Sequence, residues 1–482
     1  MPHGPKSTGV KKRPVLPVNR KKRAAHKNTP LANHPRGAAW SILERMGEGD
    51  QPLDTALERF FETSPSWERR DINLLHALVF GVQRRRATLD HVIHHLSNIP
   101  LPKIDPAVLN VLRVGIFQIL YMDRIPDSAA VNTAVDITKT FAPRWTAGFV
   151  NGLLRAAVRS RDRLPFPDIR TDPVHGLAVV KSFPEWLIRR WLDRWGAEEA
   201  ARLCDALNRT PPITLRTNTL RTDRDGLAAA LDKEVDLAVP THHSPDGVIV
   251  SGISASIRDL SAFHEGLFQV QDEAAQLVSR FLGPLPGETV MDACAGLGGK
   301  TGHLAALMEN RGRLAAVEVY SRKLSILEGE TRRLGISIVT PVCHDLDQGT
   351  PPCPYGPFDR ILLDAPCSGL GVLARNPDAK WSPAKKDLAG YRNRQIRFLT
   401  HLAPLVKPSG LLAYAVCSME PEEAEDVVSA FLEKHPNFSV HRDFPRLPPK
   451  ARALITPEGY LRTFPHRDDM DGFFSVCFAR KM

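Results

Sequence analysis

The sequence lacks any continuous apolar segment of membrane-spanning length. A helix that crosses a bilayer needs about 18 or more mostly apolar residues in a row, and no such run occurs among the 482 residues. The basic residues near the start are not followed by the apolar stretch of a secretory signal. We therefore expect a cytoplasmic protein that has no membrane partner.

Cysteine is scarce, and the cysteines are not arranged in pairs. No Cys-x-x-Cys spacing occurs, so the sequence predicts neither a disulfide framework nor a zinc or other metal site. In a reducing compartment each cysteine is a free thiol, and most free thiols are small buried apolar groups. Any cysteine with a chemical role must therefore be recognised from its position in the fold. The seven are Cys204, Cys294, Cys343, Cys353, Cys367, Cys417 and Cys477.

Acidic residues are absent from residues 1–36, which hold ten Lys and Arg residues. The formal net charge of the whole chain is +10, so residues 37–482 sum to about zero (10 − 10). A tail rich in Lys, Arg and Pro is typically disordered and often contacts nucleic acid. We therefore predict a disordered basic tail over residues 1–34, and the alternative is a simple solubilising extension.

Three regions follow the tail. Residues 35–162 show helical spacing of apolar residues with no strand-like alternation, for example over 105–123, and predict an all-helical domain. Residues 163–267 predict a linker, which is proline-rich over 162–175, and then a smaller α/β subdomain. Residues 268–482 alternate short apolar runs with helical stretches, which is typical of a doubly wound parallel sheet.

The expected elements follow from the same periodicities. Helices are expected at 71–85, 105–123, 128–141, 147–160, 183–195 and 197–208. Strands are expected at 213–216 and 248–250 in the smaller subdomain, and at 289–293, 314–317, 338–342, 360–363 and 411–416 in the larger one.

A glycine-rich segment follows the first strand of the expected large sheet. It reads Asp-Ala-Cys-Ala-Gly-Leu-Gly-Gly-Lys-Thr over residues 292–301, and a helix is expected from about Thr301 to Glu309. Such a loop lets the backbone approach a ligand, and the helix that follows offers free N–H groups. It is not a P-loop, because Cys294 stands where the first glycine is required. It is not a dinucleotide loop either, because Thr301 occupies the position of the last glycine.

Carboxylates stand at the ends of the next strands. Glu318 ends the second strand, where an acidic residue can accept hydrogen bonds from both hydroxyls of a ribose. The alternative is an exposed carboxylate at a strand end. Asp345 follows the third strand and Asp364 ends the fourth. Because the carboxyl ends of parallel strands meet at one edge of a sheet, we expect these side chains to face one crevice.

Two cysteines occupy the same edge. Cys367 follows the fourth strand and Cys417 closes the fifth, whereas structural cysteines are usually buried in strands or helix faces. One covalent thiol and one acid/base group would suit methylation at carbon 5 of a cytosine. Addition of a thiolate at carbon 6 makes carbon 5 nucleophilic, and the carbon-5 proton and the thiol must later leave. Spacing alone does not decide which cysteine attacks.

Several motifs together resemble one known family, the bacterial RsmB/Sun (Fmu) cytosine-5 methyltransferases of small-subunit ribosomal RNA. The resemblance covers nearly everything after the tail. Its NusB-like helical RNA-binding domain is similar at 112–127 and 149–151, and its middle region at 215–218 and 269–272. Its catalytic and C-terminal motifs are similar at 364–369, 376–378, 380–381, 463–466 and 471–474.

The resemblance implies a class I methyltransferase fold that uses S-adenosyl-L-methionine and acts on small-subunit ribosomal RNA. It implies that Cys417 is the nucleophile and that Cys367 assists breakdown of the covalent adduct. We expect a monomer. The implied cofactor-binding residues are Cys294, Ala295, Gly296, Leu297, Gly298, Gly299, Lys300, Glu318, Asp345 and Asp364.

The sequence departs from the family pattern at two places. Gly296-Leu297 stands where the family usually has Ala-Pro, and Val416 stands where Thr usually precedes the nucleophile. Two alternative functions remain open at this point. One is cytosine-5 methylation of another RNA, such as transfer RNA. The other is a non-catalytic RNA-binding factor, because the helical domain resembles an antitermination factor; methylation of DNA fits the two cysteines less well.

Overall fold

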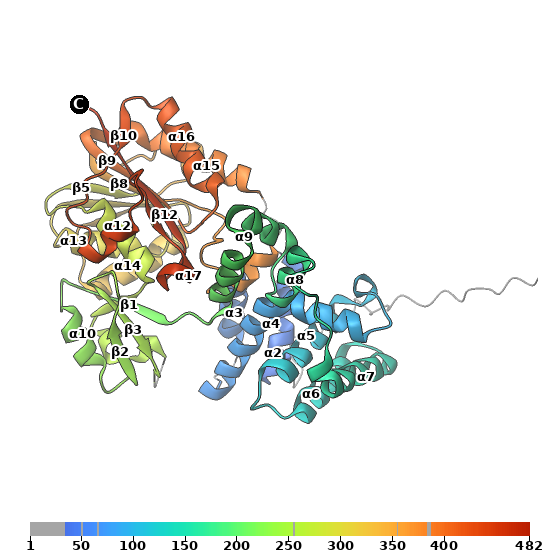
Figure 1. Cartoon of the computed structure of the whole chain (residues 1–482). Helices are drawn as coiled ribbons and strands as arrows, with labels where there is room; N and C mark the ends of the chain where they lie inside the picture. Colours follow the sequence, from blue (N-terminus) through green and yellow to red (C-terminus); the bar gives the residue numbers. More distant parts are fainter. Residues whose placement is uncertain (1–33, 50–51, 65–66, 254–255, 354, 383–386) are drawn as a thin grey trace, which may run out of the picture. The chain divides into compact units, whose positions relative to one another are not determined.

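The computed structural model describes residues 34–49, 52–64, 67–253, 256–353, 355–382 and 387–482. The chain divides into two compact units, and the boundary lies between Cys204 and Asp205 (Figure 1). The predicted basic tail, residues 1–34, lies outside the described residues except for His34.

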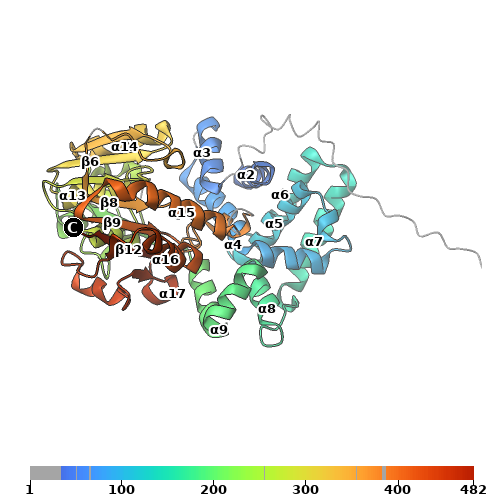
Figure 2. The same ribbon diagram turned by 90° about the horizontal axis from the view of Figure 1, so that it is seen from above.

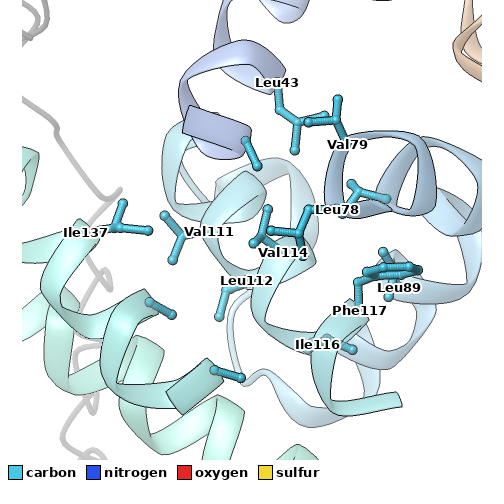
Figure 3. Close-up of a cluster of buried hydrophobic side chains, with 14 of the residues drawn as sticks. Leu43, Leu78, Val79, Leu89, Val111, Leu112, Val114, Ile116, Phe117 and Ile137 are labelled. Atoms are coloured by element: carbon cyan, nitrogen blue, oxygen red, sulfur yellow. The ribbon is translucent and has the colours of Figure 1, made fainter. Parts of the chain in front are cut away.

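Helix α5 (Pro106–Tyr121) is central to the core of the first unit. The carboxylate of Asp105 accepts a hydrogen bond from the Ala107 N–H over 2.8 Å and caps the helix. Twelve of its sixteen residues are buried, and Figure 3 shows its side chains meeting those of neighbouring helices. Burial of each large aliphatic side chain contributes about 1.5–3 kcal/mol. The other helices of this unit are α2 (Pro35–Gly49), α3 (Leu53–Thr63), α4 (Arg69–Leu96), α6 (Asp127–Phe141), α7 (Arg144–Ser160) and α8 (Pro173–Val180).

The predicted helices of this unit are present, but two expectations about their limits were wrong. Helix α4 continues to Leu96, well beyond the expected end at residue 85. The arginines at 84–86 hid the continuation, because after Gln83 the buried positions resume only at Thr88 and Leu89. The expected linker 162–175 is shorter, because α8 already begins at Pro173 behind the capping carboxylate of Asp172. Helix α9 (Glu185–Asn208) breaks at Gly196, between the two helices expected there.

A small antiparallel sheet opens the second unit. Its strand order is β2-β3-β1-β4, in which β1 (Ile213–Thr217) pairs with β3 (Gly247–Ser251) on one side and β4 (Phe268–Val270) on the other. The predicted strands correspond to β1 and β3, whereas β2 (Leu237–Pro240) and β4 were not expected because both are short. Helices α10 (Arg224–Leu231) and α11 (Ser261–His264) accompany this sheet.

The large sheet has the order β10-β12-β9-β8-β5-β6-β7. Five neighbouring strands are parallel, as predicted, and the chain leaves β5 on one side and returns to it on the other. A crevice at the carboxyl ends of the strands is expected beside such a reversal of strand order. The parallel strands are β5 (Thr289–Asp292), β6 (Arg313–Glu318), β7 (Val339–Cys343), β8 (Phe358–Asp364) and β9 (Val406–Val416).

Both faces of this sheet are buried, and side chains alternate between them. In β9, Leu412 and Tyr414 belong to one apolar cluster, and Ala413 belongs to the other. Helices α15 and α16 contribute to the first cluster, and α12 and α13 contribute to the second (Figures 1 and 2). The helices are α12 (Glu273–Leu282), α13 (Gly299–Leu307), α14 (Ser321–Leu334), α15 (Leu388–Leu402), α16 (Glu425–Lys434) and α17 (Pro465–Asp468).

The end of the chain adds antiparallel strands that the sequence did not predict. Strand β12 (Phe473–Arg480) pairs with β9, and both β10 (Phe438–Val440) and β11 (Leu461–Thr463) pair with β12. The long β12–β9 ladder covers the outer side of the strand that leads to Cys417.

Candidate active site

The predicted site residues lie at the carboxyl ends of the parallel strands. Glu318 is the last residue of β6 and Asp364 is the last residue of β8. Cys417 directly follows β9, and Cys367 lies in the loop that follows β8. The sheet order places β8 between β9 and β5, so the thiols and the glycine-rich loop share one edge.

The glycine-rich loop takes a conformation that only glycine adopts easily. Gly296 and Gly298 have φ values of +57° and +90°, in the left-handed region that disfavours residues with a Cβ atom. A Cβ at Gly298 would also lie 2.9 Å from Cγ of Leu327, whereas one at Gly296 would meet open space. Helix α13 begins at Gly299, earlier than the expected start near Thr301. The loop therefore leads directly into the first turn of α13, and the N-terminus of a helix is suited to binding polar or anionic groups.

The Glu318 carboxylate is hydrogen-bonded to the glycine-rich loop. Its Oε2 atom accepts a hydrogen bond from the Gly296 N–H over 3.1 Å, and Oε1 accepts one from the Tyr320 N–H over 3.0 Å. The side chain is buried, and the Lys323 ammonium lies 3.8 Å from Oε1. A carboxylate offers about four acceptor sites, so these contacts leave capacity for the two hydroxyls of a ribose.

Lys300 is a largely buried cation in the first turn of α13, with a side chain that is 11% exposed. Its Nζ donates to Oδ2 of Asp364 over 2.6 Å and lies 5.2 Å from the centre of the Phe473 ring. Burial by itself would lower the pKa of Lys300, but the Asp364 carboxylate and the Cys417 sulfur raise that pKa above its usual value. Lys300 therefore remains an ammonium ion close to the thiols, which is the kind of environment that stabilises a thiolate.

The two thiols are in direct contact. Sγ of Cys367 lies 3.3 Å from Sγ of Cys417. Backbone hydrogen bonds connect their loops, from the Ala365 N–H to the Ala415 carbonyl over 2.9 Å and from the Gly371 N–H to the Cys417 carbonyl over 3.0 Å. The hydrogen bond with Cys417, burial and the charge of Glu423 raise the pKa of Cys367 well above its usual value. Cys367 therefore favours its protonated form.

Other predicted residues have different surroundings. The Asp345 carboxylate accepts a hydrogen bond from the Asp347 N–H over 3.0 Å and caps a short 3-10 helix. Cys294 packs against the apolar cluster to which α15 and α16 contribute. Burial, followed by the charge of Asp292, raises the pKa of Cys294 well above its usual value. The Leu297 side chain is 51% exposed. Gly296-Leu297, which stands in place of the usual Ala-Pro, therefore leaves an exposed apolar side chain on the glycine-rich loop.

The sequence did not point to several polar residues behind the thiols. Ser368 and Ser418 each follow one of the two cysteines, and both are bound to the buried carboxylate of Glu423. The repeated Cys-Ser pair was the available signal, but nothing in the spacing indicated a common partner. Asp292 was also missed: its Oδ2 accepts a hydrogen bond from Thr301 Oγ1 over 2.7 Å, and burial raises its pKa to about 6.

Comparison with known proteins assigns the family. The family described as 16S rRNA methyltransferase RsmB/F matches residues 279–479, the NusB family matches 33–159, and the RsmF/B-like ferredoxin-like domain matches 183–255. The probable ribosomal RNA small subunit methyltransferase B of Bacillus subtilis is 36% identical over 409 residues, which cover 85% of this chain and 90% of that relative. The chain belongs to the RsmB/F family.

Other similarities agree with this membership and with the predicted fold. The probable ribosomal RNA small subunit methyltransferase B of Synechocystis is 35% identical over 440 residues, which cover 91% of this chain and 98% of that relative. The solved structure of PH0851 has a TM-score of 0.76 and 28% identity, and the match covers 94% of this chain and 99% of that one. The RsmB/F chain thus combines a NusB-like helical domain with an α/β methyltransferase domain.

The residues at the strand ends of this RsmB/F member fit a methyl donor of the S-adenosylmethionine type. The open space beside Gly296, the free first turn of α13 and the acceptor capacity of Glu318 suit a nucleoside with ribose hydroxyls. Among the described residues, no group of three or more His, Cys, Asp or Glu side chains is placed to hold a metal ion. Within the same residues, no helix combines the length and apolar character needed to span a bilayer.

Proposed function

We propose that this protein transfers a methyl group from S-adenosyl-L-methionine to carbon 5 of a cytosine in small-subunit ribosomal RNA. The observation that carries the proposal is the contact of two thiols, 3.3 Å apart, at the ends of neighbouring parallel strands. Support for the RNA class comes from the relatives, which are named ribosomal RNA small subunit methyltransferases.

In this proposal Cys417 is the nucleophile. Its thiolate adds to carbon 6, so that a carbon–sulfur bond forms and the electron pair of the 5,6 double bond makes carbon 5 nucleophilic. The ammonium of Lys300 favours the anionic form of a sulfur close to it. S-adenosyl-L-methionine, when bound, supplies an electrophilic sulfonium methyl group.

Cys367 serves the second half of the reaction in this proposal. After methylation, carbon 5 holds both a proton and the new methyl group. A base must take that proton so that the 5,6 double bond re-forms and the bond between carbon 6 and sulfur breaks, with the Cys417 sulfur leaving as a thiolate. Cys367 can be this base only after its own thiol proton has passed to solvent. The 3.3 Å contact between the two sulfurs supports this role, because a sulfur that touches Cys417 would also be close to the ring atom that Cys417 would attack.

The residues expected to hold the methyl donor are those of the glycine-rich loop and the strand ends. Glu318 would accept hydrogen bonds from the ribose hydroxyls, and the loop from Cys294 to Lys300 would contact the donor through its backbone. Asp345 and Asp364 would line the remaining edge of the crevice. Residues 35–162 would contribute RNA binding.

The test is to incubate the protein with labelled S-adenosyl-L-methionine and either small-subunit ribosomal RNA or transfer RNA. Bisulfite sequencing then locates 5-methylcytosine, and we expect it in the ribosomal RNA. If 5-methylcytosine is found only in transfer RNA, the substrate is transfer RNA and the assignment to ribosomal RNA is wrong. Absence of cofactor binding by calorimetry, together with retained RNA binding, would instead support a non-catalytic RNA-binding factor.

A further inference from the structure

A glutamine that follows the small sheet faces the first turn of α13. Gln271 comes directly after β4, and its side chain belongs to a residue that is only 8% exposed. If Gly299, the first residue of α13, had a Cβ atom, the nearest heavy atom of the described residues outside the adjoining helix would be Nε2 of Gln271, at 4.0 Å. The space beside the Gly299 Cα atom is therefore open, and the Gln271 carboxamide borders it.

The orientation of this carboxamide is fixed by Arg216, a buried residue of β1. Nη1 of Arg216 donates a hydrogen bond to Oε1 of Gln271 and another, over 2.6 Å, to the carbonyl of Gly299. A guanidinium group can only donate, so the carboxamide atom that faces it must be the oxygen. The carboxamide nitrogen is consequently the atom turned toward the open space beside Gly299.

The N–H groups of this carboxamide are available to a ligand. The backbone N–H of Gln271 donates to the Thr214 carbonyl over 3.0 Å, and the Gln271 carbonyl accepts a hydrogen bond from Nε2 of Gln276 over 2.9 Å. Within the part of the chain that the structure describes, Nε2 of Gln271 itself has no hydrogen-bond partner. A largely buried donor is costly to leave without a partner, so these N–H groups favour a bound group that accepts hydrogen bonds.

The first turn of α13 provides further donors at the same place. A helix leaves its first N–H groups without partners inside the helix, and the N-cap residue Gly298 has no side chain to supply one. These N–H groups, together with the helix dipole, favour a negatively charged group. An anionic acceptor beside Gly299 would therefore meet donors from the helix and from Gln271.

We propose that Gln271 donates a hydrogen bond to the carboxylate of the methionine moiety of the methyl donor. This inference rests on the proposed function, because it names the group of S-adenosyl-L-methionine that Gln271 recognises. The carboxylate is the anionic group of that donor and is small enough to lie beside a nearly buried residue. The small sheet thus contributes to the cofactor site: Glu318 of the large sheet binds the ribose, and Gln271 binds the opposite end of the donor.

The test compares two ligands that differ only in the carboxylate. S-adenosylhomocysteine, which is the donor without its methyl group, and its decarboxylated analogue share the adenosine, an uncharged sulfur and the amine. Calorimetry with the full-length protein, without RNA, measures the Kd of each ligand. Gln271→Met keeps the length of the side chain and removes the carboxamide. It should raise the Kd of S-adenosylhomocysteine about tenfold or more, because a hydrogen bond to a charged group is lost, and should change that of the analogue by less than about twofold.

Gln269→Met is the matched control. Oε1 of Gln269 also accepts a hydrogen bond from Arg216, over 2.8 Å. A Cβ at Gly302, three residues further along α13, would lie 3.1 Å from this oxygen, so the Gln269 carboxamide packs against the helix beyond its first residue. Gln269→Met therefore removes an acceptor of Arg216 without removing a donor beside Gly299. It should leave the ratio of the two Kd values unchanged.

A second variant of Gln271 reverses the interaction. Gln271→Glu keeps an oxygen acceptor for Arg216 but places a carboxylate against the carboxylate of the ligand. It should weaken binding of S-adenosylhomocysteine by at least about tenfold and should not weaken binding of the decarboxylated analogue. If Gln271→Met does not fold, the folded Gln271→Glu variant decides, because an unchanged ratio of the two Kd values there would overturn the proposal.

The outcomes separate this inference from the proposed function. Equal weakening of both ligands by Gln271→Met would overturn the inference, because Gln271 would then only support the glycine-rich loop. Unchanged affinity for both ligands would also overturn it, and a loss of RNA binding in the same variant would indicate an RNA phosphate as the partner of Gln271. Both results leave the proposed function intact. Failure of the unmodified protein to bind either ligand would overturn the proposed function together with the inference.

Discussion

The sulfur atoms of Cys367 and Cys417 are in contact at 3.3 Å, although 50 residues separate the two cysteines along the chain. The contact arises because β8 and β9 are parallel neighbours and each cysteine follows the end of its strand. At this distance both sulfurs can reach the same ring of a bound base. Their roles must then differ through charge and orientation, and variants of the two cysteines should behave differently.

Replacement of each cysteine should give opposite results. Cys417→Ala should abolish both methyl transfer and any covalent RNA adduct, because this variant lacks the sulfur that we propose attacks carbon 6. Cys367→Ala should still attack and methylate but remain attached to its product. Denaturing electrophoresis after incubation with RNA and labelled S-adenosylmethionine should show a shifted protein–RNA band for Cys367→Ala. A trapped adduct from Cys417→Ala alone would reverse the two roles, and normal turnover by both variants would exclude the covalent mechanism.

Glu318→Ala should weaken cofactor binding and leave the fold intact. Each charge-assisted hydrogen bond to a ribose hydroxyl contributes about 1.5–3 kcal/mol, so Kd should rise at least about tenfold. Loss of the bond to the Gly296 N–H should also loosen the glycine-rich loop. Calorimetry with S-adenosylmethionine measures the effect, and Glu328→Ala, on the exposed side of α14, is the control. Equal affinities for the two variants would reject the assignment of Glu318.

Lys300→Met should strongly reduce the rate of methylation and moderately reduce the free energy of unfolding. The substitution keeps the length of the side chain but leaves Asp364, which is 30% exposed, without its 2.6 Å partner. We expect a loss of about 1–3 kcal/mol in the free energy of unfolding, less than for a fully buried pair. The double variant Lys300→Met/Asp364→Asn should recover stability but not activity. Recovery of both would show that Lys300 acts only through its ion pair.

The pH dependence of stability should report Asp292. Burial raises the pKa of this carboxyl to about 6 in the folded state, whereas an unfolded chain ionises it near 3.9. The folded state therefore holds a proton that the unfolded state releases between about pH 4 and pH 6, and this group costs stability as the pH rises through that window. The total cost is about 3 kcal/mol above pH 6.

Asp292→Asn removes this titration. Chemical denaturation of the variant and the unmodified protein at pH 4, 5, 6 and 7 would measure it. Relative to the unmodified protein, the variant should gain stability with rising pH and reach a constant difference above about pH 6. A difference that is independent of pH would mean that Asp292 ionises at its ordinary pKa.

Removal of residues 1–34 should weaken RNA binding and flatten its dependence on salt. This segment carries nine of the ten Lys and Arg residues found in residues 1–36 and no acidic residue. Each phosphate contact that is lost should reduce the slope of log K against log salt by roughly 0.7–0.9. Fluorescence titrations at several salt concentrations measure the slope, and the rate of methylation at saturating RNA is the control. An unchanged slope would show that the tail does not contact RNA.

The sequence predicted the large sheet because each parallel strand is a short apolar run followed by a helix. It did not predict β10 and β11, because strands of three residues are too short to show a period. The eight-residue strand β12 was also not predicted; most of its residues are buried, so its apolar positions do not alternate with polar ones. The continuation of α4 to Leu96 was hidden by a run of arginines. The spacing of apolar residues therefore predicts helices and strands that bury one complete face. It does not predict elements whose burial depends on distant parts of the chain.

The sequence indicated where the candidate site lies, but it did not reveal the buried polar residues that hold the site in place. Strand ends and chemistry together indicated Cys367, Cys417 and Glu318, and their roles stay predictions. Glu423 could not be identified in this way, because its four hydrogen bonds come from three separate segments of the chain. Buried polar groups that join distant loops leave no local pattern in a sequence.

The pairing of β9 with β12 has a consequence for the time at which the site forms during protein synthesis. The Gly371 N–H donates to the Cys417 carbonyl and the Gly472 N–H donates to the Gly371 carbonyl, so the cysteine loops rest on the residue directly before β12. Until residues 473–480 leave the ribosome, β9 is an exposed sheet edge and the thiol loops lack this support. A nascent chain therefore acquires its two-thiol centre only after residues 472–480 have been synthesised and have paired with β9.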